Sequence, residues 1–148
     1  MLEIQREDGT IEKTELETKA FVPHDFIHYA VEKEAGLKES FWGQIAHGKT
    51  FSELTNKEQM TSIGDLLLPT TEIGITEMMT GILTGFLKGD MSEDMVLPAA
   101  ENIFNARGLA VPGYLTPVFL VRAKETFRKT FGHWNAIGKD EPMLLEWN

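Results

Sequence analysis

Two histidines four residues apart are the feature of this sequence that most directly suggests chemistry. His24 and His28 lie in the segment Pro-His-Asp-Phe-Ile-His, and on a helix this spacing places both imidazoles on one face, within reach of a single metal ion. The His-Glu-x-x-His motif of zinc peptidases uses the same geometry, with the glutamate as general base. Here Asp25 occupies the position of that glutamate. The pattern therefore predicts a metal site with Asp25 as its candidate catalytic residue.

A metal held by two imidazoles needs a further protein ligand, and Glu32, one turn beyond His28, is the nearest candidate. His47 and His133 are the only other histidines, and either could complete a site. Zinc, nickel, iron and manganese all accept imidazole and carboxylate ligands, so the residue types predict a divalent metal such as zinc without selecting one. With the two histidines and Glu32 as ligands, and Asp25 orienting a ligand or activating water, the reaction would be metal-assisted hydrolysis.

The same residues also have a purely structural interpretation. A proline in the first turn, here Pro23, followed by an acidic residue is typical of helix N-termini and needs no ligand. Aspartate is also shorter than glutamate, so a base at position 25 would lie further from a metal-bound water than in a peptidase. The two histidines could simply hydrogen-bond the backbone or neighbouring side chains. The sequence leaves a metal site and a structural helix start as alternatives.

The composition is that of one domain and excludes several functions. Of the 148 residues 42% are hydrophobic, enough for a sizeable core, so we expect a single domain over residues 1–148. The absence of cysteine excludes disulfides, thiolate ligands and a cysteine nucleophile. A formal net charge of −9 repels nucleic acid unless basic residues cluster, and Glu125 interrupts the nearest cluster, at residues 122–129. We therefore expect no nucleic-acid partner.

The sequence also indicates where the protein works. The first residues are charged where a secretory signal needs an apolar run. The longest apolar-rich stretch, residues 73–87, is shorter than the roughly 20 residues of a membrane-spanning helix and contains Glu77. We therefore expect a cytoplasmic protein with no membrane segment.

The two ends of the chain predict a small antiparallel sheet. Asp8-Gly9 lies between two polar-rich runs within residues 2–18, and this dipeptide is typical of a two-residue type I′ hairpin turn. Residues 142–147 have strand character. A lone terminal strand would expose its backbone groups, so we expect it to pair with the N-terminal hairpin.

Most of the chain between these strands is predicted to be helical. Proline at the start and glycine at the end mark the first long helix, and apolar residues at steps of three and four mark the helix that begins at Thr71. Thr55 and Glu58 have the spacing of a capping box, and Pro98 is expected to kink or restart its helix. The predicted helices cover residues 23–36, 41–47, 55–68, 71–88, 92–108 and 116–132. The predicted fold class is therefore α+β, mostly helical.

Two further features suit a protein without catalysis. Gly81, Gly85 and Gly89 recur every four residues and would let another helix approach closely, either in the core or in a homodimer. Large aromatic residues at 41–42 and 133–134 favour buried anchors, with ligand stacking as the alternative. No serine-hydrolase elbow and no phosphate-binding loop of the P-loop type occurs. The alternative to an enzyme is thus a binding or interaction protein with a small-molecule or protein partner.

Short motifs at both ends of the chain suggest relatives. A helix start of the form Pro-His-Asp-x-x-His at residues 23–28 is followed by Phe-Trp-Gly-x-x-Ala-x-Gly at residues 41–48 and by Trp147. This combination resembles a group of small bacterial proteins of unassigned function. The resemblance covers the opening hairpin, the first two helices and the last strand. It implies a cytoplasmic protein of bacterial type and supplies no activity.

Overall fold

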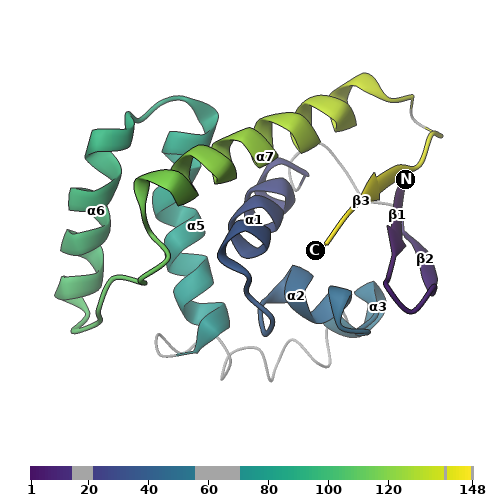
Figure 1. Cartoon of the computed structure of the whole chain (residues 1–148), viewed down its shortest axis with the longest axis horizontal. Coiled ribbons are helices and arrows are strands. Elements are labelled where there is room, and N and C mark those ends of the chain that lie inside the picture. The colour runs from purple at the N-terminus through teal and green to yellow at the C-terminus, as the bar shows by residue number, and fades with distance from the viewer. Residues whose placement is uncertain (15–21, 56–70, 139, 148) are drawn as a thin grey trace.

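The computed structural model describes residues 1–14, 22–55, 71–138 and 140–147, which form helices around a small sheet (Figure 1). The strands are β1 (Leu2–Gln5), β2 (Ile11–Thr14) and β3 (Met143–Leu145). The helices are α1 (Val22–Ala35), α2 (Phe41–Ala46), α3 (Phe51–Thr55), α5 (Glu72–Lys88), α6 (Glu93–Ala106) and α7 (Pro117–Ala136). The α+β class is therefore confirmed. The predicted helix over residues 55–68 and its capping box fall almost wholly outside the described residues.

The opening hairpin is confirmed, but its loop is one residue longer than expected. Gly9 N donates to Arg6 O and Arg6 N donates to Thr10 O, so the loop between the hydrogen-bonded pair Arg6 and Thr10 has three residues instead of the two of a type I′ turn. Gly9, the last residue of this loop, has a φ of 84°. Three-residue hairpin loops typically have a residue in this left-handed conformation at their last position. The Asp8 carboxylate accepts hydrogen bonds from the backbone and hydroxyl of Thr10, which fixes the turn.

The C-terminal strand pairs with β1 as expected, but in the opposite direction. The sheet order is β2-β1-β3, with β1 antiparallel to β2 and parallel to β3, so the sheet is mixed and not antiparallel. The reason is the path of the chain: α7 ends near the end of the sheet at which β1 starts, and β3 then runs alongside β1 (Figure 1). Leu2 faces Met143 in this register, and both are fully buried.

The helix boundaries follow from capping chemistry. Thr71 and Thr116 each accept a hydrogen bond from the backbone three residues further on, and so begin α5 and α7 as predicted. Gly36 ends α1 with a φ of 67°, and the amide of the following residue returns to Glu32 O. These caps confirm the predicted starts of α5 and α7 and the predicted end of α1.

One predicted boundary was wrong, and one of the two alternatives predicted for Pro98 is excluded. Pro98 does not restart the helix, because α6 is one continuous element from Glu93 to Ala106; a kink at Pro98 stays a prediction. The last helix does not stop at Gly132 but continues to Ala136. Gly132 has an ordinary helical backbone there, and a Cβ would meet nothing within 4 Å. A glycine ends a helix only where the chain adopts the left-handed conformation, as at Gly36.

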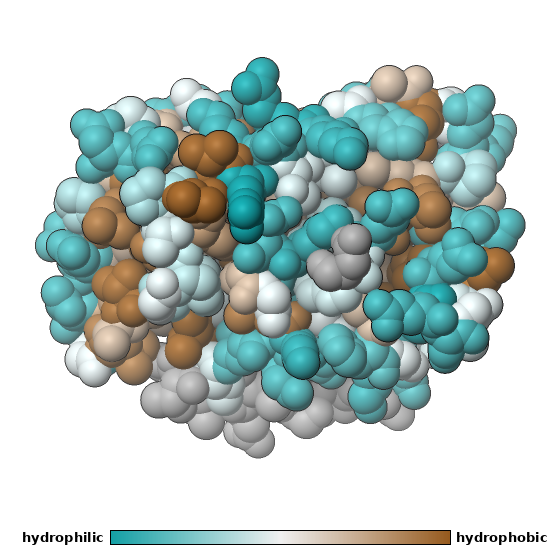
Figure 2. Space-filling view, in the orientation of Figure 1, coloured by the Kyte–Doolittle hydropathy of each residue, from teal (hydrophilic) through white to brown (hydrophobic). Residues whose placement is uncertain are grey.

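The core forms around α1, which packs against α2, α5 and α7. Its apolar stripe was predicted correctly, since Phe26, Ile27, Ala30 and Val31 are all buried. The outer face in Figure 2 is largely hydrophilic, with apolar side chains scattered on the side formed by α6 and the start of α7. Met95 of α6 and Val118 of α7 are both more than half exposed. Among the described residues, no helix has the length and apolar character needed to cross a bilayer.

Candidate metal centre

His24 and His28 project from the first turns of α1 and lie against each other. Their ring centroids are 4.6 Å apart, with the ring planes at 73°. The predicted helix brings the pair together as expected for a spacing of four. The two environments differ, because His24 is exposed at the surface whereas His28 is only 8% exposed. One imidazole is therefore open to solvent, and the other is enclosed by its surroundings.

The third member of the cluster comes from α5, not from α1. Glu77 Oε1 lies 3.2 Å from His28 Nε2, and one ligand atom each from His24, His28 and Glu77 lie within 4.8 Å of one another. The hydroxyl of Thr80, one turn along α5, also lies 3.5 Å from His28 Nε2. The cluster reaches the surface, since both His24 and Glu77 are exposed. Two imidazoles and a carboxylate form a ligand set that zinc and related ions accept.

Glu32, the predicted third ligand, lies on the other side of His28. Its side chain is fully buried, and Oε1 lies 3.2 Å from His28 Nδ1. Oε2 accepts hydrogen bonds from the amides of Trp42 at 2.6 Å and Gly43 at 3.3 Å, at the start of α2. Both carboxylate oxygens thus have partners, and Glu32 is not part of the three-residue cluster. It orients His28 and fastens α1 to α2.

Gly43 makes this arrangement possible. A Cβ at this position would lie 2.3 Å from Leu37 O and 2.8 Å from the backbone of Lys38, so only glycine allows the first turn of α2 to pack against this segment. That close approach brings two amides of α2 to the Glu32 carboxylate. The Phe-Trp-Gly motif therefore serves the positioning of His28 through Glu32.

The charges of the cluster follow from its hydrogen bonds. Burial opposes protonation of His28, but hydrogen bonds to Glu32 and Glu77 outweigh it and raise the pKa of His28 to about 9. The hydrogen bond from His28 lowers the pKa of Glu77, so this carboxylate is ionised at neutral pH. Burial and the nearby His28 lower the pKa of His24, which leaves its ring neutral. Burial raises the pKa of Glu32. Its hydrogen bonds to His28 and to the α2 amides lower this pKa, but by less than burial raises it.

Asp25, the candidate catalytic residue, is half-buried on α1 beside the histidine pair. Burial raises the pKa of Asp25 to about 6, although the charge of His28 opposes this. Its backbone oxygen accepts a hydrogen bond from the indole of Trp42. The carboxylate of Asp25 is not one of the three clustered ligand atoms. The structure thus places it next to the cluster without assigning it a role.

The remaining histidines and the glycine series lie elsewhere. His47 donates through Nδ1 to Gly43 O, and His133 is exposed near the end of α7. Gly81 is exposed and meets no described neighbour, and Gly89 is the left-handed cap of α5. Within the described residues the series thus does not mediate close packing between helices. A homodimer through this helix stays a prediction.

Glu77 was not identified as a site residue from the sequence, although a signal was present. It stands in an apolar helix, and Thr80 and Thr84 follow it at steps of three and four along the same flank. Such a polar flank beside a buried stripe marks a face that meets other polar groups. The sequence alone does not say which helix supplies those groups.

Comparisons of the chain with protein-family models, curated proteins and solved structures gave no match. The resemblance to small bacterial proteins therefore stays a prediction, and a function must be argued from the side-chain geometry.

Proposed function

We propose that the protein binds a divalent metal ion through His24, His28 and Glu77, and that the bound ion supports metal-assisted hydrolysis. The observation that carries the proposal is the convergence of three ligand atoms from two helices within 4.8 Å. A zinc ion holds nitrogen and oxygen ligands at about 2.0–2.2 Å in a tetrahedron, which separates them by about 3.3 Å. His28 Nε2 and Glu77 Oε1, at 3.2 Å, already have this spacing.

The hydrogen bond between His28 and Glu32 supports the same proposal. Histidines that bind a metal through one ring nitrogen commonly donate the other N–H to a carboxylate, which fixes the ring and strengthens the ligand. Glu32 holds Nδ1 in this way, and Nε2 lies against Glu77, where the ion would take the place of the Nε2 proton. Because the α2 amides fix Glu32 in turn, His28 is orientated before any ion arrives.

The proposed site has three protein ligands at the surface, which leaves a fourth position for water. Three-ligand zinc sites with an open position are the catalytic type, since the metal lowers the pKa of the bound water. Asp25, with a pKa of about 6, is suited to accept a proton at neutral pH. This makes hydrolysis the reaction class that the residues favour.

Metal binding is tested on untagged protein, so that no affinity tag contributes histidines. Zinc titrated into the metal-free protein and followed by calorimetry should bind one equivalent, and His24→Asn and Glu77→Gln should each weaken binding about tenfold or more. Both residues are exposed, so neither change should unfold the protein. His133→Asn is the matched control and should bind like wild type. Equal affinity in all four proteins would end the proposal and leave His28 as a structural bridge between two carboxylates.

Hydrolysis is tested separately with activated ester and phosphodiester substrates that release nitrophenol. The zinc-loaded protein should cleave one of them, a chelator should abolish the rate, and Asp25→Asn should lower kcat while leaving zinc affinity unchanged. Turnover that persists in Glu77→Gln or in the chelator would contradict the metal mechanism. Zinc binding without turnover of either substrate class would remove the catalytic half of the proposal.

A further inference from the structure

A second site with different chemistry lies on another face of α1. A cavity of about 300 Å³ opens between α1, α2 and the end of β1, a volume at the lower end of the range for small-molecule sites. None of the residues of the metal centre lines it. Its apolar lining includes Ile4, Tyr29, Trp42, Ile45, Leu145 and Trp147.

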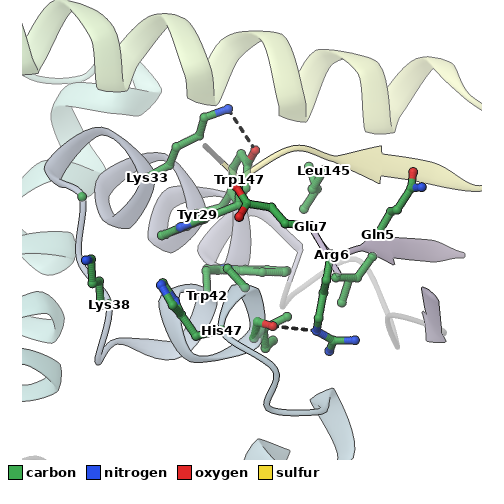
Figure 3. A pocket seen from close by; sticks show the side chains of 14 residues that line it. Gln5, Arg6, Glu7, Tyr29, Lys33, Lys38, Trp42, His47, Leu145 and Trp147 are labelled. Atoms are coloured by element: carbon green, nitrogen blue, oxygen red, sulfur yellow. Dashed lines mark hydrogen bonds between the residues drawn. The ribbon is translucent and has the colours of Figure 1, made fainter. Parts of the chain in front are cut away.

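Three aromatic rings form a continuous wall of this cavity. Tyr29 meets Trp42 edge-to-face at 5.7 Å between centroids and meets Trp147 in the same way at 6.2 Å. In Figure 3, Tyr29 and Trp147 lie above Trp42 and His47. The hydroxyl of Tyr29 donates to Glu146 O, which ties the C-terminal segment to α1 and holds Trp147 in place. Such a wall suits a flat apolar body, because aromatic rings provide a large contact area with little conformational freedom to lose.

The charges at the cavity are the reverse of those of the whole chain, which carries a net −9. Three cationic side chains, Arg6, Lys33 and Lys38, line it against the single carboxylate of Glu7. Arg6 is neutralised by Glu12 at 2.7 Å. The two lysines, by contrast, have no carboxylate partner among the described residues.

The contacts of Lys33 leave its charge available. Its ammonium group donates to the backbone oxygen Glu146 O at 2.9 Å and lies 5.6 Å from the centre of the Tyr29 ring. Both partners are neutral. Figure 3 shows Lys33 and Lys38 on the side of the cavity away from Gln5. An anionic group that enters here meets two lysines that form no ion pair with a described carboxylate.

We propose that this cavity binds a small organic anion, consisting of a carboxylate attached to a flat apolar or aromatic body. The body lies along the wall of Tyr29, Trp42 and Trp147, and the carboxylate pairs with Lys33 and Lys38. The site is independent of the metal centre, because the two share no ligand-contacting residue. Failure of one proposal therefore leaves the other intact.

The three tryptophans allow the site to be located by NMR. The probe is 2-naphthoate, with the neutral 2-naphthamide as its uncharged analogue. Saturable shifts are expected at the indole N–H signals of Trp42 and Trp147 with 2-naphthoate, and weaker binding with the amide. Trp134 packs against Phe26 outside the cavity and should not respond. No saturable shift up to the solubility of the probe, or equal shifts at all three indoles, would overturn the proposal.

Substitutions test the role of charge. Lys33→Met and Lys38→Met remove the charge and keep most of the length of the side chain, and each should weaken 2-naphthoate binding about fivefold to tenfold while leaving 2-naphthamide binding unchanged. Glu7→Gln should strengthen 2-naphthoate binding, because it removes the opposing carboxylate. Lys124→Met is the matched control, since Lys124 lies over the Phe86 ring, away from the cavity. Unchanged affinity in both lysine variants, or equal binding of the acid and the amide, would exclude an anion site.

Discussion

The two flanks of α1 differ in whether their charged side chains have charged partners. On one flank the imidazole of His28 lies between the carboxylates of Glu32 and Glu77, so these three side chains are paired with one another. Tyr29 and Lys33 follow His28 and Glu32 directly in the sequence and lie on the other flank, where they line the aromatic cavity. There the Lys33 ammonium group donates to two neutral acceptors, the Tyr29 hydroxyl and the backbone oxygen of Glu146. The comparison separates two uses of polar side chains. Paired and buried charges hold the helices in place, and unpaired charges at a cavity are available to a ligand.

The largest expected effect is the loss of the buried carboxylate. Glu32→Ala removes the partner of a buried imidazole and of two amides, and should lower the free energy of unfolding by about 3–5 kcal/mol. Glu77→Gln acts on the exposed partner of the same ring and should cost no more than about 1 kcal/mol. Urea unfolding at neutral pH in a chelator measures both. Similar losses in the two variants would mean that burial does not distinguish the partners of His28.

A smaller loss is expected from Gly43, which brings α2 to Glu32. Gly43→Ala places a methyl group against the backbone of Leu37 and Lys38, and overpacking of this kind costs about 1–3 kcal/mol. Gly81→Ala is the control, because its methyl group meets no described neighbour and alanine is favoured over glycine in a helix by about 0.5–1 kcal/mol. Thermal unfolding should therefore shift down for the first variant and up for the second. A shift in the same direction for both would contradict the close approach at Gly43.

A further test is the response of the paired flank to pH in metal-free protein. The folded-state pKa of His28, about 9, lies above its ordinary value of 6.5. The stabilisation from its protonation is therefore complete below about pH 6.5 and is lost as the pH rises through 9. An NMR titration of the ring should give a midpoint near 9 in wild type and a lower one in Glu77→Gln. A wild-type midpoint near 6.5 would show that the carboxylates do not hold the proton.

The sequence predicted the parts of the site that depend on local spacing. The pairing of His24 with His28 follows from helix geometry, and so does the position of Glu32 one turn further on. Helix geometry does not give the direction in which the Glu32 carboxylate turns. That depends on the approach of Gly43, which no local pattern encodes. Glu77 was missed for a related reason, because its contact with His28 joins two helices that are far apart in the sequence.

The fold shows the same division between local and long-range information. Thr116 and Gly36 specify a helix start and a helix end through their own backbone and side-chain chemistry, and both were predicted. The direction of β3 depends instead on the end of the sheet at which α7 ends. A strand of three residues carries no signal that distinguishes parallel from antiparallel pairing.

The parallel pairing of β3 with β1 sets an order of events during synthesis on the ribosome. Leu2 pairs with Met143, and Met143 is translated after β1 and after the described helices that lie between them in the sequence. Until then one edge of β1 has open hydrogen-bonding groups, which other extended chains can bind. That edge of β1 can therefore be covered by β3 only after the described helices have been translated.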